Sequence, residues 1–184
     1  MIRDLFRAAR RYLTAMADPK SKKRKRRVQY AALPYRKGPE GLEIMLITSR
    51  ETRRWVIPKG WPMKGLKPFA AARREALEEA GLVGRIAKDA AGAYEYGKRL
   101  RTGEVVPCTV HVFPLRVEKQ RERWREQGQR EARWFTPEGA AGAVAEPGLA
   151  EIVLRFQEGR GRRKEAAPPP PPEPPAPAEA VDQR

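Results

Sequence analysis

Three closely spaced glutamates are the residues of this chain best suited to do chemistry. At helical spacing Glu75, Glu78 and Glu79 fall within an arc of about 100°, so their carboxylates share one face. Like charges three or four residues apart cost a helix about 0.2–0.5 kcal/mol per pair unless a cation compensates them. The spacing therefore predicts either a metal-ion site or a set of arginine partners on this face.

The same segment is also typical of an ordinary solvated helix. Residues 73–80 are good helix formers, and Arg74 can pair with Glu78 one turn later. The flanking sequence favours a site, because a strand is expected to end at Pro58 and Lys59-Gly60 opens a loop just before the helix. A basic, glycine-containing loop followed by an acidic helix would suit a phosphate-binding site with a metal ion.

Basic residues flank the acidic helix and are candidates for phosphate contacts. Positive groups stabilise the charge that develops on phosphoryl oxygens. Each of these residues could equally be a solvated surface charge, and Lys59, beside Gly60, is the strongest candidate. His111 is expected to be an ordinary residue of an alternating strand. The five basic candidates are Arg53, Arg54, Lys59, Lys64 and Lys67.

Strands mixed with helices would position these side chains. Strands are expected over residues 28–36, 42–49, 54–58, 94–100, 105–117 and 131–135, and helices over 68–81 and 149–157. In the first of these helices an apolar stripe opposes the glutamates, formed by Phe69, Ala72, Ala76 and Ala80. This order of elements predicts an α/β (α+β) fold in which helices cover a mixed sheet.

Composition restricts the classes of protein. The chain has 184 residues, enough for one domain, and its 39 Lys and Arg against 23 Asp and Glu give a net charge of +16. This charge favours polyanionic partners such as nucleic acid, anionic membranes and phosphorylated metabolites. Because Cys108 has no partner cysteine and no apolar run reaches about 18 residues, we expect a cytoplasmic protein without a transmembrane segment. The sequence indicates no oligomeric state.

The two ends differ in composition from the middle. Residues 1–27 combine a basic amphipathic helix over the first seventeen residues with a Lys/Arg-rich linker over 20–27, and nucleic-acid binding through this linker is one option. Residues 28–160 form the expected domain. Residues 161–184 are dominated by proline and are expected to be a disordered tail.

The stretch from Gly60 to Leu82 resembles the Nudix box, whose usual form is G-x5-E-x7-R-E-U-x-E-E-x-G-U with U a bulky apolar residue. Two positions depart from the pattern, since Leu66 replaces the early glutamate and the small Ala76 replaces an apolar residue. The positions that match are Gly60, Arg74, Glu75, Glu78, Glu79, Gly81 and Leu82.

The resemblance implies a Nudix-type α-β-α sandwich with a mixed β-sheet between helices. It implies that Glu75 and Glu79, with the backbone carbonyl of Gly60, bind Mg²⁺ or Mn²⁺. It further implies that Arg74 orients a glutamate and that Glu78 is the base, with Glu75 or a residue outside the box as alternatives. Leu66 leaves the number of metal ions open.

A wider resemblance, over residues 28–156, is to bacterial Nudix proteins of the diphosphoinositol-polyphosphate and diadenosine-polyphosphate hydrolase type. It rests on Trp55-Val56-Ile57-Pro58-Lys59-Gly60-Trp61 and on Arg133-Trp134-Phe135-Thr136-Pro137-Glu138. It implies a pyrophosphohydrolase acting on a polyphosphorylated small molecule. The alternatives are an RNA 5′-end pyrophosphohydrolase and a non-catalytic binding module of the same fold.

Overall fold

The structure, a computed structural model, describes residues 27–99 and 102–165. The amphipathic helix expected over the first seventeen residues lies outside this part, as do residues 20–26 of the basic linker and the tail beyond residue 165. Arg27, the last residue of that linker as expected, is instead the first residue of a strand. No helix in these two ranges is long and apolar enough to cross a membrane.

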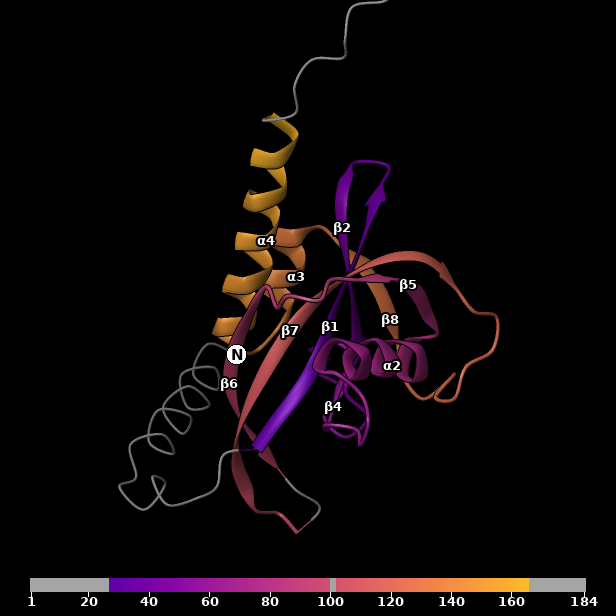
Figure 1. The fold of residues 1–184 in the computed structure, drawn as a ribbon. Helices are drawn as coiled ribbons and strands as arrows, with labels where there is room; N and C mark the ends of the chain where they lie inside the picture. Colours follow the sequence, from indigo (N-terminus) through magenta and orange to yellow (C-terminus); the bar gives the residue numbers. More distant parts are fainter. Residues whose placement is uncertain (1–26, 100–101, 166–184) are drawn as a thin grey trace, which may run out of the picture.

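One mixed sheet forms the centre of the molecule (Figure 1). Its main path runs β3-β2-β1-β7-β5, with β4 paired to β1, β6 to β7 and β8 to β2. The β1–β7 pair is parallel and the other pairs are antiparallel. The strands are β1 (Arg27–Gly38), β2 (Gly41–Thr48), β3 (Trp55–Val56), β4 (Lys59–Gly60), β5 (Leu82–Ile86), β6 (Gly92–Arg99), β7 (Val105–Gln120) and β8 (Ala132–Phe135).

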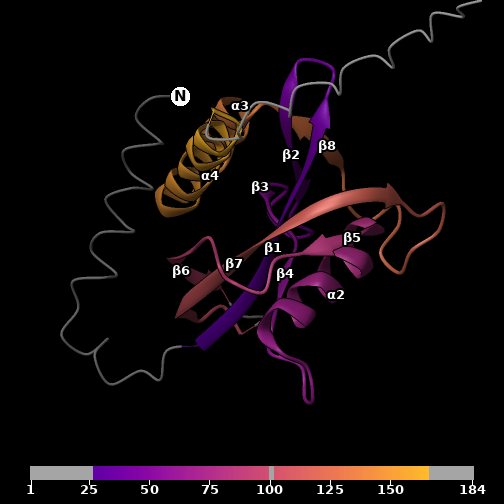
Figure 2. The ribbon, with the colours of Figure 1, turned by 45° about the horizontal axis from the view of Figure 1, so that its top comes forward.

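Helices cover both faces of this sheet, which confirms the expected sandwich. Helix α2 (Pro68–Ala80) lies on one face, and α3 (Pro137–Ala143) and α4 (Pro147–Glu165) lie on the other (Figure 2). Successive residues of β1 point to opposite faces, so Ala32 packs with the α2 core while Leu33 packs with the α3–α4 core. Helix α4 continues to Glu165, beyond the domain boundary expected at residue 160.

Helix α2 begins and ends where its sequence predicts. Lys67 is extended, Pro68 occupies the first turn, and Gly81 ends the helix in the left-handed conformation with φ of 68°. A Cβ at position 81 would lie 2.6 Å from the ring of Trp124, so this glycine also admits the Trp124 side chain. The alanines of the expected apolar stripe are buried, and they fix which face of α2 carries the glutamates.

Three elements were not expected from the sequence. One is β4, because Lys59-Gly60 was expected to open a loop and instead forms a two-residue strand. Strand β5 follows α2 directly and pairs with the end of β7, with a register shift between Val83 and Gly84. Helix α3 starts after Thr136, whose hydroxyl accepts a hydrogen bond from the Gly139 backbone N–H at 3.1 Å. The hairpin of β1 and β2, the strand β8 and the long strand β7 agree with the sequence expectation, with shifted ends.

Candidate active site

Glu75 lies directly against the backbone of Gly60. A Cβ built on Gly60 would be 1.9 Å from Glu75 Oε1, so only glycine allows this approach. Strand β4 holds Gly60 in place by pairing with Tyr30 and Ala31 of β1. The sequence thus brings the first glycine of the motif into contact with a glutamate in the next helix.

Glu79 occupies the neighbouring position one turn along α2. Its Oε2 accepts a hydrogen bond from the Lys59 backbone N–H at 3.1 Å, and its Oε1 accepts one from Arg130 Nη2. Burial raises the pKa of Glu79, and the positive charges of Arg130 and Lys59 oppose that rise. Both Glu75 and Glu79 are therefore held against the two residues of β4.

Burial also raises the pKa of Glu75, to about 7, with further contributions from the charges of Glu79, Glu78 and Glu126. Burial, and then repulsion by the neighbouring carboxylates, therefore disfavour the charged form of Glu75. A cation placed among these oxygens would favour the charged form. The arrangement is consistent with a site prepared for a positive ligand.

The pKa of Glu75 predicts how the metal-free protein responds to pH. A carboxyl whose pKa is higher in the folded state contributes stability at low pH and loses it as pH rises from its unfolded value of 4.5 to about 7. In EDTA, the wild type should therefore lose more stability over this range than Glu75→Gln, as measured by urea unfolding at successive pH values. Equal slopes for the two proteins would contradict the assignment.

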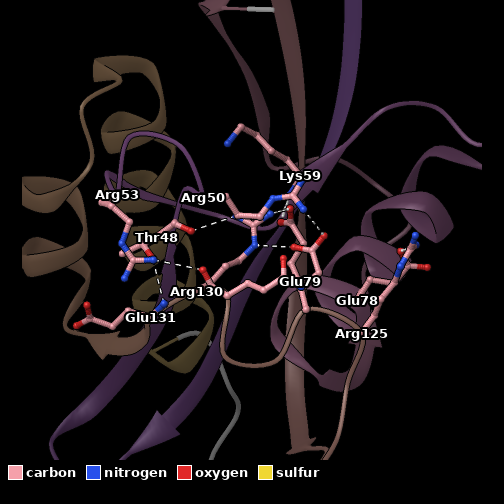
Figure 3. Close-up of polar contacts among 11 residues, drawn as sticks. Thr48, Arg50, Arg53, Lys59, Glu78, Glu79, Arg125, Arg130 and Glu131 are labelled. Carbon is pink, nitrogen blue, oxygen red and sulfur yellow. Dashed lines mark hydrogen bonds and ion pairs between the residues drawn. The ribbon is translucent and has the colours of Figure 1, made fainter. Parts of the chain in front are cut away.

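Glu78 points away from these two glutamates, toward two arginines. Arg74 Nε donates to its Oε1 and Arg125 Nη1 to its Oε2, each at 2.6 Å, and these bonds lower the pKa of Glu78. Figure 3 shows Glu78 and Arg125 apart from the facing pair of Glu79 and Arg130. In this structure Arg74 thus orients Glu78. The family resemblance implies that Glu78 is the base.

The five basic candidates separate into different roles. The Arg54 guanidinium lies 3.2 Å from the buried Glu146 carboxylate, and Arg53, at φ of 54°, donates to the Gln129 carbonyl at 3.2 Å. Lys64 and Lys67 are exposed in the segment between β4 and α2. Only Lys59 of this set extends over the sheet, with its Nζ 5.7 Å from the centroid of the Tyr96 ring.

The deciding comparison is with a family model. The model of the NUDIX domain matches residues 25–156, a range that includes every site residue named in the preceding paragraphs. The chain belongs to the NUDIX domain family. Its Nudix box is the segment from Gly60 to Leu82, and α2 is its Nudix helix.

Curated relatives of this Nudix chain occur in Arabidopsis thaliana. Nudix hydrolase 12, mitochondrial, is 34% identical over 98 residues, which cover 52% of this chain and 48% of that protein. Nudix hydrolase 13, mitochondrial, is 32% identical over 99 residues, which cover 51% and 49%. The chain therefore spans about half the length of the curated relatives it matches.

Solved structures share the Nudix fold. A Caenorhabditis elegans Ap4A hydrolase in a binary complex aligns with a TM-score of 0.57 and 19% identity, over 74% of this chain and 98% of that one. The NUDIX domain of Shewanella oneidensis NrtR complexed with ADP ribose aligns with a TM-score of 0.54 and 14% identity, over 79% and 96%. At these identities the likeness shows the fold alone.

The oxygen donors of the Nudix box suit a hard divalent cation. Mg²⁺ in proteins commonly takes one or two carboxylates and completes its shell with water and substrate phosphates. Glu75 and Glu79 supply two carboxylates beside the glycine of β4, and burial raises the pKa of both, so a bound cation would favour their charged forms. Within the two described ranges, no three acidic, His or Cys side chains form a ready-made metal cluster. The residues therefore fit a site that needs water or substrate oxygens as well.

Several site residues were missed from the sequence. Arg27 and Lys98 lie over the ring of the exposed Trp61, at 5.7 and 5.6 Å from its centroid. They form what we call the basic aromatic cluster, which consists of Arg27, Lys59, Trp61, Tyr96 and Lys98. The positive charges of Arg27, Lys59 and Lys98 all act to lower the pKa of the buried Cys108 thiol, against the effect of burial. The three cations therefore lie near the same point of the sheet. Only the position of Trp61 beside Gly60 could have signalled it.

The partly buried ion pair of Arg130 and Glu126 was also missed. Both lie in the polar stretch before β8, which the sequence shows as a run of alternating charges. The Glu126 backbone N–H donates to the Glu78 carbonyl at 3.1 Å, and this bond fastens the stretch to the end of the Nudix helix.

Proposed function

We propose that this chain is a metal-dependent Nudix hydrolase that cleaves a diphosphate linkage in a polyphosphorylated small molecule, with Mg²⁺ or Mn²⁺ as the metal. One observation carries the proposal: Glu75 lies against Gly60 while Glu79 accepts the adjacent Lys59 N–H, so two carboxylates meet the backbone of one two-residue strand. Family membership supports the same activity.

The proposed reaction assigns a task to each group of the site. Glu75, Glu79 and the Gly60 carbonyl would hold the metal ion, which would neutralise phosphate charge and lower the pKa of bound water. The lowered pKa of Glu78 makes it a poor proton acceptor near neutral pH. We therefore assign Glu78 and Arg74 a positioning role, because they link the Nudix helix to Arg125. The base is then Glu75, through its oxygen that does not hold the metal ion, or a residue outside the box.

The basic aromatic cluster is our proposed binding surface for the rest of the substrate. Burial lowers the pKa of Lys59 to about 8, so this lysine is still mostly protonated at neutral pH, and Lys98 adds a second cation close to it. Trp61 offers an exposed ring for stacking, with Arg27 and Lys98 close to it. In diadenosine polyphosphates, the cations would bind the phosphates and the aromatic ring would stack on an adenine. In diphosphoinositol polyphosphates, only the phosphates would be bound.

A panel of substrates tests the activity and ranks these classes. Phosphate release with Mg²⁺ or Mn²⁺ is measured on diphosphoinositol polyphosphates, diadenosine polyphosphates, nucleoside triphosphates and 5′-triphosphate RNA. We expect turnover on the first two classes. No turnover on any of them would contradict the proposal in favour of a binding module.

Variants of the cluster separate its two contributions. Trp61→Ala should raise KM for diadenosine polyphosphates about 5- to 150-fold, because stacking on a base is worth about 1–3 kcal/mol. It should change KM for diphosphoinositol polyphosphates much less. Lys98→Gln should raise KM for both classes. The exposed Lys88→Gln is the matched control and should change neither. Unaltered KM values in Trp61→Ala and Lys98→Gln would place substrate binding elsewhere.

The basic linker leads to a second prediction, in which the substrate is RNA. Removing residues 1–26 keeps Arg27, which lies in β1 over Trp61. Loss of RNA binding in the truncated chain, together with a steep fall of affinity with salt, would favour that alternative. We expect small-molecule turnover to survive the truncation. The cytoplasmic location also stays a prediction, and the names of two relatives place those proteins in mitochondria.

A further inference from the structure

A buried arginine lies among the carboxylates of the Nudix site. The Arg130 side chain is 8% exposed, and it connects the end of the Nudix helix with strand β2 and with its own segment before β8. Its Nη2 donates to Glu79 and its Nη1 to the Thr48 carbonyl at 3.1 Å (Figure 3). Its Nε donates to Glu126 Oε2 at 2.9 Å. Each nitrogen of the guanidinium thus has an oxygen partner.

These contacts make Arg130 the main cation beside Glu79. The second positive charge acting on Glu79 is that of Lys59, whose ammonium group extends toward Tyr96 while its backbone N–H binds Glu79. Charge-assisted hydrogen bonds from a guanidinium are among the strongest that a carboxylate makes. Arg130 therefore compensates much of the negative charge of this buried group.

Both oxygens of Glu79 are engaged in this state. Oε2 accepts the Lys59 N–H and Oε1 accepts Arg130. A divalent ion bound at Oε1 would bring two further positive charges against the guanidinium, at a separation where like charges repel strongly in a poorly solvated place. Arg130 and a metal ion are thus alternatives at that oxygen.

We propose that Arg130 is the resident counter-ion of the Nudix carboxylates and competes with the divalent ion for Glu79, so that Arg130 releases Glu79 when metal binds. This inference rests on the proposed function for the identity of the metal site. The consequence is that the free protein binds the metal ion more weakly than the same carboxylates would bind it without Arg130. Glu126 and the Thr48 carbonyl remain available to keep Arg130 nearby after release.

Calorimetric titration with Mn²⁺ tests the competition in the absence of substrate. Arg130→Met should bind Mn²⁺ at least ten-fold more tightly than the wild type, because the competing cation is gone. Arg50→Met is the matched control. Arg50 also pairs with Glu126, at 3.3 Å, but is 57% exposed, and the structure gives it no contact with Glu79, so this variant should bind Mn²⁺ like the wild type. Unchanged or weaker binding by Arg130→Met would overturn the inference.

A second measurement uses the wild-type protein and does not depend on the folding of Arg130→Met. The Arg130 Nη2–H resonance comes from the nitrogen that donates to Glu79 and is assigned by its loss in Arg130→Lys. It should shift and exchange faster with water as Mg²⁺ is added. A resonance that stays unchanged while Mg²⁺ binds would overturn the proposal. Absence of metal binding in wild type and variant alike would contradict the proposed function as well. If the wild type turns over substrate and binds Mn²⁺ with the same affinity as Arg130→Met, the competition by Arg130 is contradicted and the proposed function is not.

Discussion

Glu79→Gln should lower kcat about 10²- to 10³-fold on the best substrate of the panel. The variant loses a metal-binding charge, which is worth several kcal/mol in the transition state, and each 1.36 kcal/mol corresponds to a factor of ten in rate. The glutamine keeps an oxygen that can still accept a hydrogen bond from the Lys59 N–H, so the fold should persist. Steady-state kinetics at saturating Mg²⁺, with circular dichroism of both proteins, gives the comparison.

Glu78→Gln provides the contrast within the same helix. Because Glu78 is held by Arg74 and Arg125 away from Glu79, its neutral form should lower kcat less than ten-fold. Glu118→Gln, a change at an exposed residue paired with Arg85, should leave kcat unaltered. A loss in Glu78→Gln as large as that in Glu79→Gln would restore Glu78 to the role of base.

Gly60→Ala should have the second largest effect, with kcat lowered by about 10²-fold or more. The new Cβ would overlap Glu75 Oε1, which lies 1.9 Å from its position, so Glu75 would have to leave β4. A misplacement of about 1 Å at a reacting centre can cost about 10² in rate. Because β4 is only two residues long, its pairing with β1 would shift as well.

The matched control for this substitution is Gly142→Ala. Gly142 lies in α3, its added Cβ would meet nothing within 4 Å, and its backbone does not adopt a positive φ. It should keep full activity, with stability equal to or slightly above the wild type. Full activity in Gly60→Ala would show that Glu75 does not need this contact for turnover.

The Nudix helix was predictable because its signals are local. Pro68 and Gly81 mark its ends, and the alanine stripe fixes its buried face, so the sequence alone predicts which side carries the glutamates. The hairpin of β1 and β2 was predictable for the same reason. Strand β5 was missed because Gly84 interrupts its alternation, at the position where the register shifts against β7.

The surroundings of the glutamates could not be derived in the same way. Helical geometry places three carboxylates on one face, but it does not determine which of them meets a cation from elsewhere in the chain. Arg130 and Arg125 come from a charged segment that is typical of a solvated loop, and they separate Glu79 from Glu78 in environment. Lys98 reaches Trp61 through the pairing of β6 with β7, a contact that no local pattern encodes.

The parallel pairing of β1 with β7 also determines when the protein can fold during synthesis. Arg27 pairs with Cys108 and Tyr35 with Arg116, so the central strands join across most of the domain. Closing so long a loop is entropically costly and slows folding. The glutamates of α2 leave the ribosome before β7 is complete, so the sheet on which α2 packs still lacks β7 and the strands that pair with it on that side. A nascent chain that ends within residues 82–104 therefore contains the whole catalytic motif on an incomplete sheet.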